Sequence, residues 1–301
     1  MFPEYQPKTK SYVDTDRHPS DWPMVFTERD RRILEHIHVH DGLLSDYQVK
    51  ELEFTGMRQT RERLGKLFHN GYLARTNRMG RARYGYKIYW LTKKGAQEVA
   101  GSQGKELGEL RYLKTPRWSQ VEHDVRANDF TIIIQQACQR SDEEFQLLEW
   151  INEGTFRAYP DTVDYTSVTN RKARKRVIPD GYFLVERLGA SPFRSRLLLE
   201  LDHATHSNPR FADEKVLPGV AYLRSGAYKQ RFGSASGRWL VVTTGEQRLH
   251  YLKETTERVA GNDAAVWYFT TFNLVSAEAV LTAPIWYPGG KSEPIPLFPS
   301  R

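Results

Sequence analysis

Residues 177–205 constrain the fold more than any other stretch, because they combine two strand patterns with a set of carboxylates. Residues 177–186 are apolar and aromatic, and residues 196–201 form a Leu-rich run bounded by charge. Strand-forming runs on both sides of a Gly-Ala-Ser-Pro segment predict an antiparallel hairpin with a loop longer than two residues. We therefore expect two neighbouring strands of a sheet here.

Acidic residues stand at matching ends of the two expected strands. Asp180 opens the first strand, and Glu200 and Asp202 lie near the end of the second. Antiparallel pairing brings Asp180 and Glu200 to one end of the sheet, and hard divalent cations such as Mg²⁺ or Mn²⁺ bind carboxylates gathered in this way. The hairpin therefore predicts a candidate cation site.

The same residues resemble the PD-(D/E)xK nuclease-like fold. The motifs that carry the resemblance are Pro179-Asp180 and, at the end of the second strand, Glu200-Leu201-Asp202. Asp202 stands where active nucleases have a lysine that helps to activate water, a role that an aspartate cannot take over. The resemblance therefore implies a fold more directly than a reaction.

This resemblance also implies a set of candidate site residues. The candidate metal ligands are Glu122 on a preceding helix, Asp180, Glu200 and Asp202. Acid–base chemistry needs a basic group near the metal-bound water, for which Lys215 is the obvious candidate and Lys229 the next. Asp180, Glu200 and Lys215 are then the candidate catalytic residues of a DNA endonuclease. The alternative, which we favour, is a retained fold whose acidic residues pair with arginines without catalysis.

Length and charge bound the class of protein. With 301 residues the chain exceeds one average domain, and 39% hydrophobic residues indicate a globular protein. A net charge of +7 and an isoelectric point near 9.3 favour a polyanionic partner. The single cysteine, Cys138, excludes a disulfide framework and is expected in the core. With no signal or membrane-spanning pattern, we expect a soluble cytoplasmic protein.

Residues 1–22 are polar and aperiodic and are expected to form a flexible arm, and residues 23–100 a first domain. Three helical patterns begin near Thr27, Ser45 and Met57, and two strand patterns flank a Gly- and Arg-rich tip at residues 77–85. Three helices followed by a basic hairpin is the order of a winged helix-turn-helix. Of the hairpin aromatics, Tyr84, Tyr86, Tyr89 and Trp90 are interpreted as core rather than as base-stacking residues.

Basic residues gather where such a domain would contact double-stranded DNA. The third helix would present polar side chains to a major groove, and the wing arginines would reach phosphates or a minor groove. A solvated basic face is the alternative interpretation. The candidate DNA-binding residues of this domain are Arg58, Gln59, Arg61, Arg63, Lys66, Arg78, Arg81, Arg83 and Lys87.

The rest of the chain predicts a second domain. Residues 101–117 are expected to be a linker, residues 118–275 an α/β domain and residues 276–301 an extended, Pro-rich tail on the surface. The expected element order is close to the αβββαβ core of restriction-endonuclease-like domains, so the fold class is α+β or α/β. The basic run at residues 171–176 predicts either a phosphate-binding loop or a solvated one. Its candidate DNA-binding residues are Arg171, Lys172, Arg174 and Lys175.

Several histidines have the spacing of possible ligands but favour ordinary roles. His203 and His206 flank a polar loop beside Asp202, and such pairs are usually incidental. His123 on its helix is more often a hydrogen-bonding residue than a base. We therefore assign no metal site to these histidines.

With these pieces placed, the chain resembles the replication-relaxation family of plasmid and mobile-element proteins over residues 27–245. The motifs that carry the resemblance are TERDRRILEHI, TRERLGKLFHNGYLAR, EHDVRANDF, IPDGYF and LLLELDHAT. The family strand likewise tends to end in Glu-x-Asp, which makes Asp202 ordinary within the family. The resemblance implies DNA binding in replication, transfer or transcriptional control.

Three functions remain open at this stage. The leading one is a homodimeric, double-stranded DNA-binding regulator or replication accessory with a non-catalytic nuclease-like domain. The second is a Mg²⁺- or Mn²⁺-dependent endonuclease or nickase that uses Asp180 and Glu200. The third is a scaffold on which the α/β domain binds a replication or transfer protein.

Overall fold

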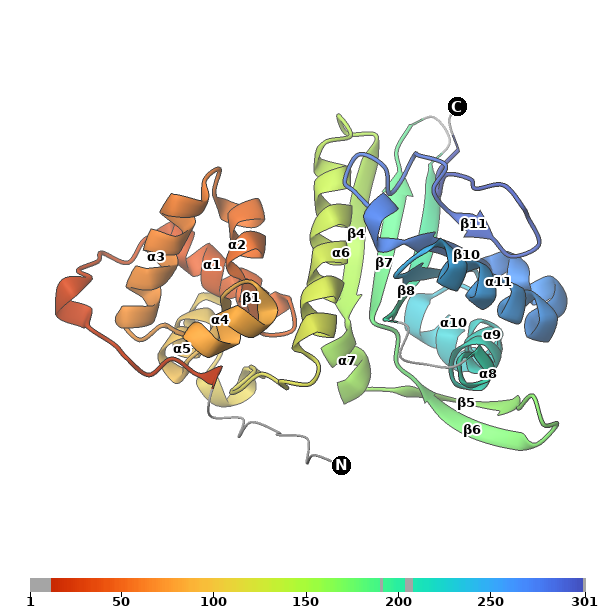
Figure 1. Cartoon of the computed structure of the whole chain (residues 1–301), viewed down its shortest axis with the longest axis horizontal. Helices are drawn as coiled ribbons and strands as arrows, with labels where there is room; N and C mark the ends of the chain where they lie inside the picture. The colour runs from red at the N-terminus through yellow and green to blue at the C-terminus, as the bar shows by residue number, and fades with distance from the viewer. Residues whose placement is uncertain (1–11, 190–191, 204–207, 300–301) are drawn as a thin grey trace. The chain divides into compact units, whose positions relative to one another are not determined.

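The computed structural model describes residues 12–189, 192–203 and 208–299, and the chain divides into two compact units, Met1–Ile132 and Ile133–Arg301. The first unit contains helices and a small antiparallel sheet, and the second is built on a six-stranded mixed sheet (Figure 1). The expected mixed α+β class is therefore confirmed. The boundary between the units falls within one helix, α6 (Val121–Gln139).

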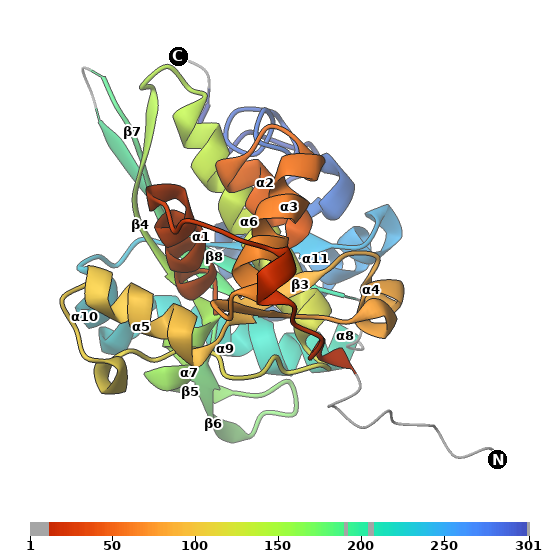
Figure 2. The ribbon, with the colours of Figure 1, turned by 90° about the vertical axis from the view of Figure 1, so that its left-hand side faces the viewer.

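Five α-helices precede α6 in the described part of the first unit (Figure 2). Local sequence sets where they begin: a reciprocal capping box between Thr27 and Asp30 opens the first, and one between Ser45 and Gln48 opens the second. They pack Ile33, Leu64 and Leu67 into the core. The helices are α1 (Glu28–Val39), α2 (Asp46–Glu53), α3 (Met57–His69), α4 (Arg78–Tyr84) and α5 (Lys93–Ser102).

The sheet of the first unit has the order β1-β3-β2, with β1 (Leu43–Ser45), β2 (Leu73–Arg75) and β3 (Ile88–Leu91). The antiparallel pairing of β2 with β3 confirms the expected hairpin. The expected loop at its tip is wrong, because residues 78–84 form helix α4. Asn77 caps this helix by accepting a hydrogen bond from the backbone of Gly80, and Gly85 ends it with φ of 80°.

The described part of the expected N-terminal arm packs against the first unit. Arg17 donates a 2.8 Å hydrogen bond to the carbonyl of Leu73, and Trp22 stacks on His69 with ring centroids 4.9 Å apart. Tyr12 is buried against Tyr84. Residues 1–11 of the arm lie outside the described residues.

The segment expected to be a linker also joins the first unit. Leu110 is buried in its core, together with the partly buried Leu107 of a short 3₁₀ turn, η3 (Leu107–Glu109). The start of α6 is tied to the same unit, since Asn128 donates hydrogen bonds to the carbonyls of His40 and Leu43. Apolar residues in the segment 101–117 thus pack into the first unit, so the segment is not a free linker.

The sheet of the second unit has the order β11-β10-β9-β8-β7-β4. Strands β4, β7 and β8 form an antiparallel meander, and β8, β9 and β10 are parallel. The meander confirms the expected pairing of the β7–β8 hairpin, whose turn residues 190–191 lie outside the described residues. The strands are β4 (Phe145–Asn152), β7 (Gly181–Arg187), β8 (Phe193–Asp202), β9 (Arg238–Thr243), β10 (Trp267–Thr271) and β11 (Tyr287–Pro288).

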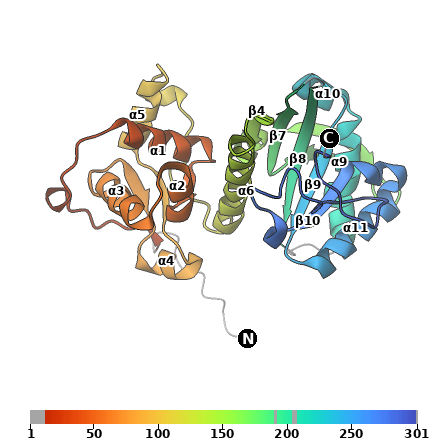
Figure 3. The same ribbon diagram turned by 90° about the horizontal axis from the view of Figure 1, so that it is seen from above.

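Helices from the C-terminal half cover one face of this sheet (Figure 3). Tyr182, Leu198, Trp239 and Trp267 stand in register across four strands and form the centre of the core beneath them. Pro218, which disfavours an uninterrupted helix, lies in the first turn of α9. The helical segments are α7 (Glu153–Ala158), α8 (Asn208–Phe211), the π-helical η4 (Ala212–Val216), α9 (Leu217–Leu223), α10 (Gly226–Phe232) and α11 (Glu246–Ala260).

A two-stranded ribbon formed by β5 (Asp161–Thr166) and β6 (Lys172–Val177) projects from the second unit (Figure 1). The expectation of a loop at residues 171–176 is therefore wrong for most of that run. Ala173, Lys175 and Val177 share the less exposed face of this strand, and Val177 enters the core.

The expected surface tail is also wrong in part. Trp286 and Phe298 are fully buried, and Phe298 packs against Phe145 with ring centroids 5.0 Å apart. Trp286 donates a 2.9 Å hydrogen bond to the carbonyl of Val280 and bridges to Ile295. The apolar residues between the prolines therefore complete the second unit.

Candidate functional site

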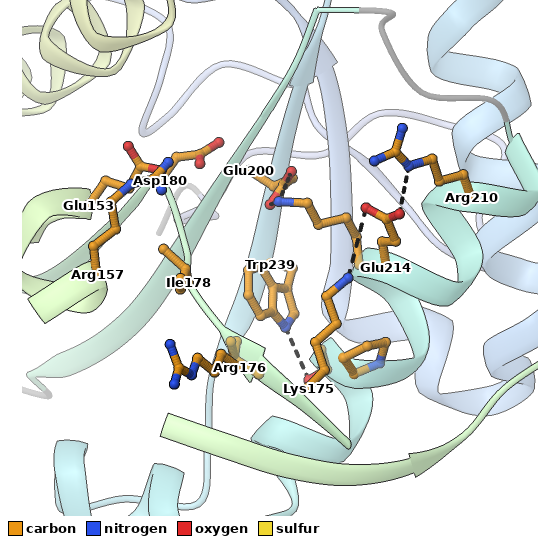
Figure 4. A pocket seen from close by; sticks show the side chains of 14 residues that line it. Glu153, Arg157, Lys175, Arg176, Ile178, Asp180, Glu200, Arg210, Glu214 and Trp239 are labelled. Carbon is orange, nitrogen blue, oxygen red and sulfur yellow. Dashed lines mark hydrogen bonds and ion pairs between the residues drawn. The ribbon is translucent and has the colours of Figure 1, made fainter. Parts of the chain in front are cut away.

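A cavity of about 490 Å³ in the second unit collects most of its candidate chemistry (Figure 4). It is bounded by α7, strand β6 of the ribbon, the residues that lead into β7, the end of β8 and the run from α8 to α9. Both acidic and basic side chains line it. The acidic residues are Glu153, Asp180, Glu200 and Glu214, and the basic residues are Arg157, Lys175, Arg176, Arg210 and Lys215.

An ion pair between Glu200 and Lys215 lies at the centre of this cavity. Nζ of Lys215 is 2.6 Å from Oε1 and 2.7 Å from Oε2 of Glu200, whose side chain is 8% exposed. Burial opposes the charge of Lys215, but the carboxylates of Glu200 and Asp180 outweigh it and raise the pKa of this lysine. The structure thus places the predicted lysine directly against a predicted carboxylate.

Asp180 reaches the same cavity from the start of β7. Its backbone N–H donates to the carbonyl of Leu199, and its Oδ2 accepts a 2.6 Å hydrogen bond from the backbone N–H of Leu201. Antiparallel pairing of β7 with β8 produces this arrangement, because it sets Gly181 opposite Leu199. Asp180 and Glu200 therefore line one cavity.

Glu153 is a cavity residue that the sequence reasoning missed. It opens α7, directly after Asn152, whose side chain caps that helix. Glu153 is 4% exposed and pairs with Arg157, and one of its oxygens lies within 4.8 Å of an oxygen of Asp180. An Asn-Glu pair at the junction of a strand and a helix was the available signal, although it says nothing about which other carboxylates lie nearby.

Asp202, predicted as a metal ligand, faces a different environment. Its two carboxylate oxygens each accept a 2.9 Å hydrogen bond from Arg248 of α11, and Oδ2 also accepts one from Thr243. This buried pairing leaves Asp202 outside the cavity lining. Glu122, another predicted ligand, is an exposed residue of the first unit. Lys229 is exposed on α10 and does not line the cavity.

The first unit presents a second candidate site, a basic surface on α3 and α4. Arg58 and Gln59 are exposed near the start of α3, and Arg78, Arg81 and Arg83 are exposed on α4. Within the described part of the chain, no acidic side chain forms an ion pair with Arg58, Arg78 or Arg81. These side chains are available to a polyanion.

Other predicted DNA-binding residues of this unit have partners within the fold. Arg63 binds the buried Asp30 through its Nε at 2.5 Å, and this hydrogen bond raises the pKa of Arg63. Arg61 pairs with Asp46 at 2.9 Å. Arg63 therefore belongs to the framework, and Arg61 is exposed but already paired.

Lys66 and Lys87 are also constrained. Lys66 pairs with Glu62 one turn away at 3.1 Å. Lys87 is half-buried, and burial, followed by the nearby Arg75, lowers the pKa of this lysine. The aromatic residues Tyr84, Tyr89 and Trp90 are buried, which confirms that they belong to the core.

The structure also places the predicted histidines and the residues of the basic run. The ring of His203 lies 5.6 Å from that of Phe272, whereas His206 lies outside the described residues. On the ribbon, Arg174 is 3.5 Å from Asp164 and Lys175 is 3.8 Å from Glu214. The remaining basic residues of this run, Arg171, Lys172 and Arg176, are exposed.

The two units define a mixed α+β protein that combines an arginine-bearing helical unit with a carboxylate–lysine cavity on a mixed sheet. The model of the Replication-relaxation family matches residues 34–236, which is more than half of the chain. The chain therefore belongs to the Replication-relaxation family, as its motifs predicted. Comparison with curated proteins and with solved structures gives no match. Across the residues that the structure describes, no helix is both long and apolar enough to span a membrane.

Proposed function

We propose that this protein binds double-stranded DNA of a plasmid or other mobile element, through a winged helix-turn-helix in its first unit. The observation that carries the proposal is the exposed α3–α4 surface, where Arg58, Arg78 and Arg81 have no acidic partner among the described residues. An arginine that is already in an ion pair must give up its carboxylate before it can bind a phosphate, whereas these three can neutralise phosphates directly.

The element order of the first unit supports this proposal. Helices α2 and α3 follow each other closely, and β2 and β3 form the hairpin behind them. Leu64, Leu67 and Phe68 anchor α3 in the core, so that Arg58 and Gln59 face solvent. A helix anchored in this way can enter a major groove with its N-terminal polar residues. Helix α4 then occupies the place of the wing tip.

Membership of the Replication-relaxation family supports a role in replication, transfer or transcriptional control of such an element. In this proposal the protein acts as a regulator or replication accessory and binds as a homodimer, since paired half-sites suit helix-turn-helix proteins. The second unit contributes a nuclease-like α/β framework for dimerisation or further DNA contact.

Reversing the charge of Arg58 tests whether α3 contacts the DNA. Arg58→Glu should weaken binding to duplex DNA from around the protein's own gene by at least tenfold, because a phosphate or base contact becomes repulsive. Arg111→Glu, an exposed change outside α3 and α4, is the charge-matched control. Equal affinities of both variants and the unmodified protein in a fluorescence-anisotropy titration would show that α3 is not the contact.

One observation favours a second candidate function, divalent-metal-dependent DNA cleavage. The Glu200–Lys215 pair beside Asp180 supplies the lysine that Asp202 cannot replace. The residues fit a cation in part: Glu153 and Asp180 offer oxygens within 4.8 Å of each other, whereas Asp202 is bound to Arg248. A bound Mg²⁺ or Mn²⁺ would supply water activation, and Lys215 would hold positive charge near a phosphate.

Cleavage is tested by following strand integrity during the same titration, first with EDTA and then with Mn²⁺. Nicks that require Mn²⁺ and disappear in Asp180→Asn would establish the nuclease. Glu254→Gln, which changes an exposed carboxylate of α11 outside the cavity lining, should leave any nicking unchanged. Intact strands in both conditions would leave Asp180 and Glu200 with a structural role.

A further inference from the structure

We propose that the β5–β6 ribbon contacts the backbone of one nucleic-acid strand and holds that strand at the carboxylate cavity. The proposal rests on the proposed function in taking nucleic acid as the ligand, but it assigns a separate contact in the second unit. Lys172, Arg174 and Arg176 occupy alternate positions of β6, and all three are exposed. They therefore form a single row on one face of the ribbon.

The spacing of this row suits successive phosphates. Alternate residues of an antiparallel strand are about 6.8 Å apart, from a rise of about 3.4 Å per residue. This distance is comparable to that between neighbouring phosphates along one strand of a nucleic acid. Lys172, Arg174 and Arg176 can therefore follow one backbone without reading its bases, as expected for phosphate contacts.

Hydroxyl groups lie across from two of these cations. The register of the ribbon sets Thr166 opposite Lys172 and Thr162 opposite Arg176, and both threonines are exposed. Each pair offers a cation and a hydroxyl donor on the same face, which is a common combination in contacts to phosphate oxygens. The ribbon thus carries two matched cation–hydroxyl pairs.

The charge of this face is only partly neutralised. Arg174 is 3.5 Å from Asp164, but both side chains are largely exposed, at 74% and 80%, so the pair contributes little and can exchange for a phosphate. Among the described residues, no carboxylate pairs with Lys172 or Arg176. These two cations carry the net positive charge of the face.

The opposite face fixes the ribbon to the second unit. Val163 and Val177 are part of the core, and Asp161 at the base accepts hydrogen bonds from Tyr222 at 2.6 Å and from Arg231 at 2.5 Å. Beyond the end of β5, the backbone of Val168 donates to Asp213 at 2.8 Å. Because the ribbon is anchored at both ends, little conformational entropy is lost when its cations bind a ligand.

The row leads to the cavity. Lys175 and Arg176, at the end of β6, both line it, and Figure 4 shows their side chains leaving the strand in opposite directions. A strand that follows the row from Lys172 to Arg176 therefore arrives beside Arg157, on the side of the cavity that holds Asp180. The contact thus delivers a phosphate to the carboxylates and Lys215.

Salt dependence tests the ribbon in the full-length chain. Each phosphate contact contributes about 0.7 to 0.9 to the slope of log K against log salt concentration. For an oligonucleotide of unrelated sequence, Lys172→Gln combined with Arg176→Gln should therefore reduce the slope by about 1.4 to 1.8. Lys229→Gln combined with Lys291→Gln removes two exposed charges elsewhere in the second unit and should change the slope far less. An equal change in both double variants would overturn the proposal.

Two further experiments distinguish DNA contact by the ribbon from DNA contact by the first unit. A photo-crosslinking residue in place of Arg157 should attach to DNA in the otherwise unmodified chain and lose most of that attachment in the Lys172→Gln/Arg176→Gln variant. If Arg58→Glu leaves duplex binding unchanged while the ribbon variant lowers the slope, the α3 proposal fails and the ribbon proposal stands. A crosslink that persists without the ribbon cations would count against the ribbon.

Discussion

The ammonium of Lys215 lies between the two carboxylate oxygens of Glu200, at 2.6 Å and 2.7 Å, although one residue lies on a π-helical turn and the other on the central strand β8. Turns of this kind inside a helical run often occur at functional sites, because they rotate one side chain out of the regular pattern. Here the turn directs a cation to a buried carboxylate, and each charge depends on the other.

Lys215→Met should therefore destabilise the second unit by about 3 kcal/mol, because it removes the ammonium that pairs with the buried carboxylate of Glu200. Adding Glu200→Gln should recover much of that loss, since the double variant no longer buries a charge. Urea unfolding of the two single variants and the double variant measures the coupling. Additive losses would show that the pair contributes nothing of its own.

The stability of the first unit should decrease as the pH falls below about 6.5. Burial, followed by the Arg75 guanidinium, lowers the pKa of His69 from its usual value of 6.5. The neutral ring accepts a 3.0 Å hydrogen bond from the backbone of His18 through Nδ1. Because the folded pKa lies below the unfolded one, this contribution is complete above the unfolded value and is lost as the pH falls toward the folded value.

Thermal unfolding between pH 8 and 5 measures this effect, and His69→Gln should flatten the profile. Glutamine retains a hydrogen-bond acceptor but does not titrate in this range. A His69→Gln variant with the same pH profile as the unmodified protein would assign the effect to another group.

Arg63 and Arg58 should respond differently to the same substitution, although both were predicted to contact DNA. Arg63→Gln leaves the fully buried Asp30 without its ion-pair partner and should cost about 3 kcal/mol of unfolding free energy. Arg58→Gln should leave stability within about 0.5 kcal/mol of the unmodified protein, as for exposed positions generally. Denaturation and DNA titration of both variants measure the two effects. A stable Arg63→Gln variant that loses DNA binding, together with a destabilised Arg58→Gln variant that keeps it, would contradict the assignment.

Antiparallel strand pairing explains why the sequence predicted that Asp180 and Glu200 lie close together. Asp180 and Glu200 lie on neighbouring antiparallel strands, so a local reading of residues 177–205 was enough to predict their proximity. Lys215 could be named only as one of two lysines, because its direction depends on the π-helical turn. Glu153 opens α7 directly after β4, and the antiparallel pairing of β4 with β7, which sets Asn152 opposite Gly181, brings it to Asp180. That pairing joins β7 to a strand that lies well before the hairpin in the chain, so residues 177–205 alone did not reveal it.

Composition concealed other elements. The arginines of residues 78–84 suggested a loop, although Asn77 and Gly85 are good start and stop signals for a short helix. The basic run at residues 171–176 concealed a strand in which only Ala173 and Val177 mark the inner face. The apolar residues of the C-terminal segment, among them Trp286, were scattered among prolines and gave no periodic signal.

The stacked indoles of Trp239 and Trp267, 5.1 Å apart and inclined by 8°, give the second unit an intrinsic optical label. Two nearly parallel chromophores at this separation couple electronically, so they should produce a near-ultraviolet circular dichroism signal that vanishes when β9 and β10 separate. The part of this signal that is lost in a Trp239→Phe variant therefore follows the unfolding of the second unit in the full-length chain, without any added dye.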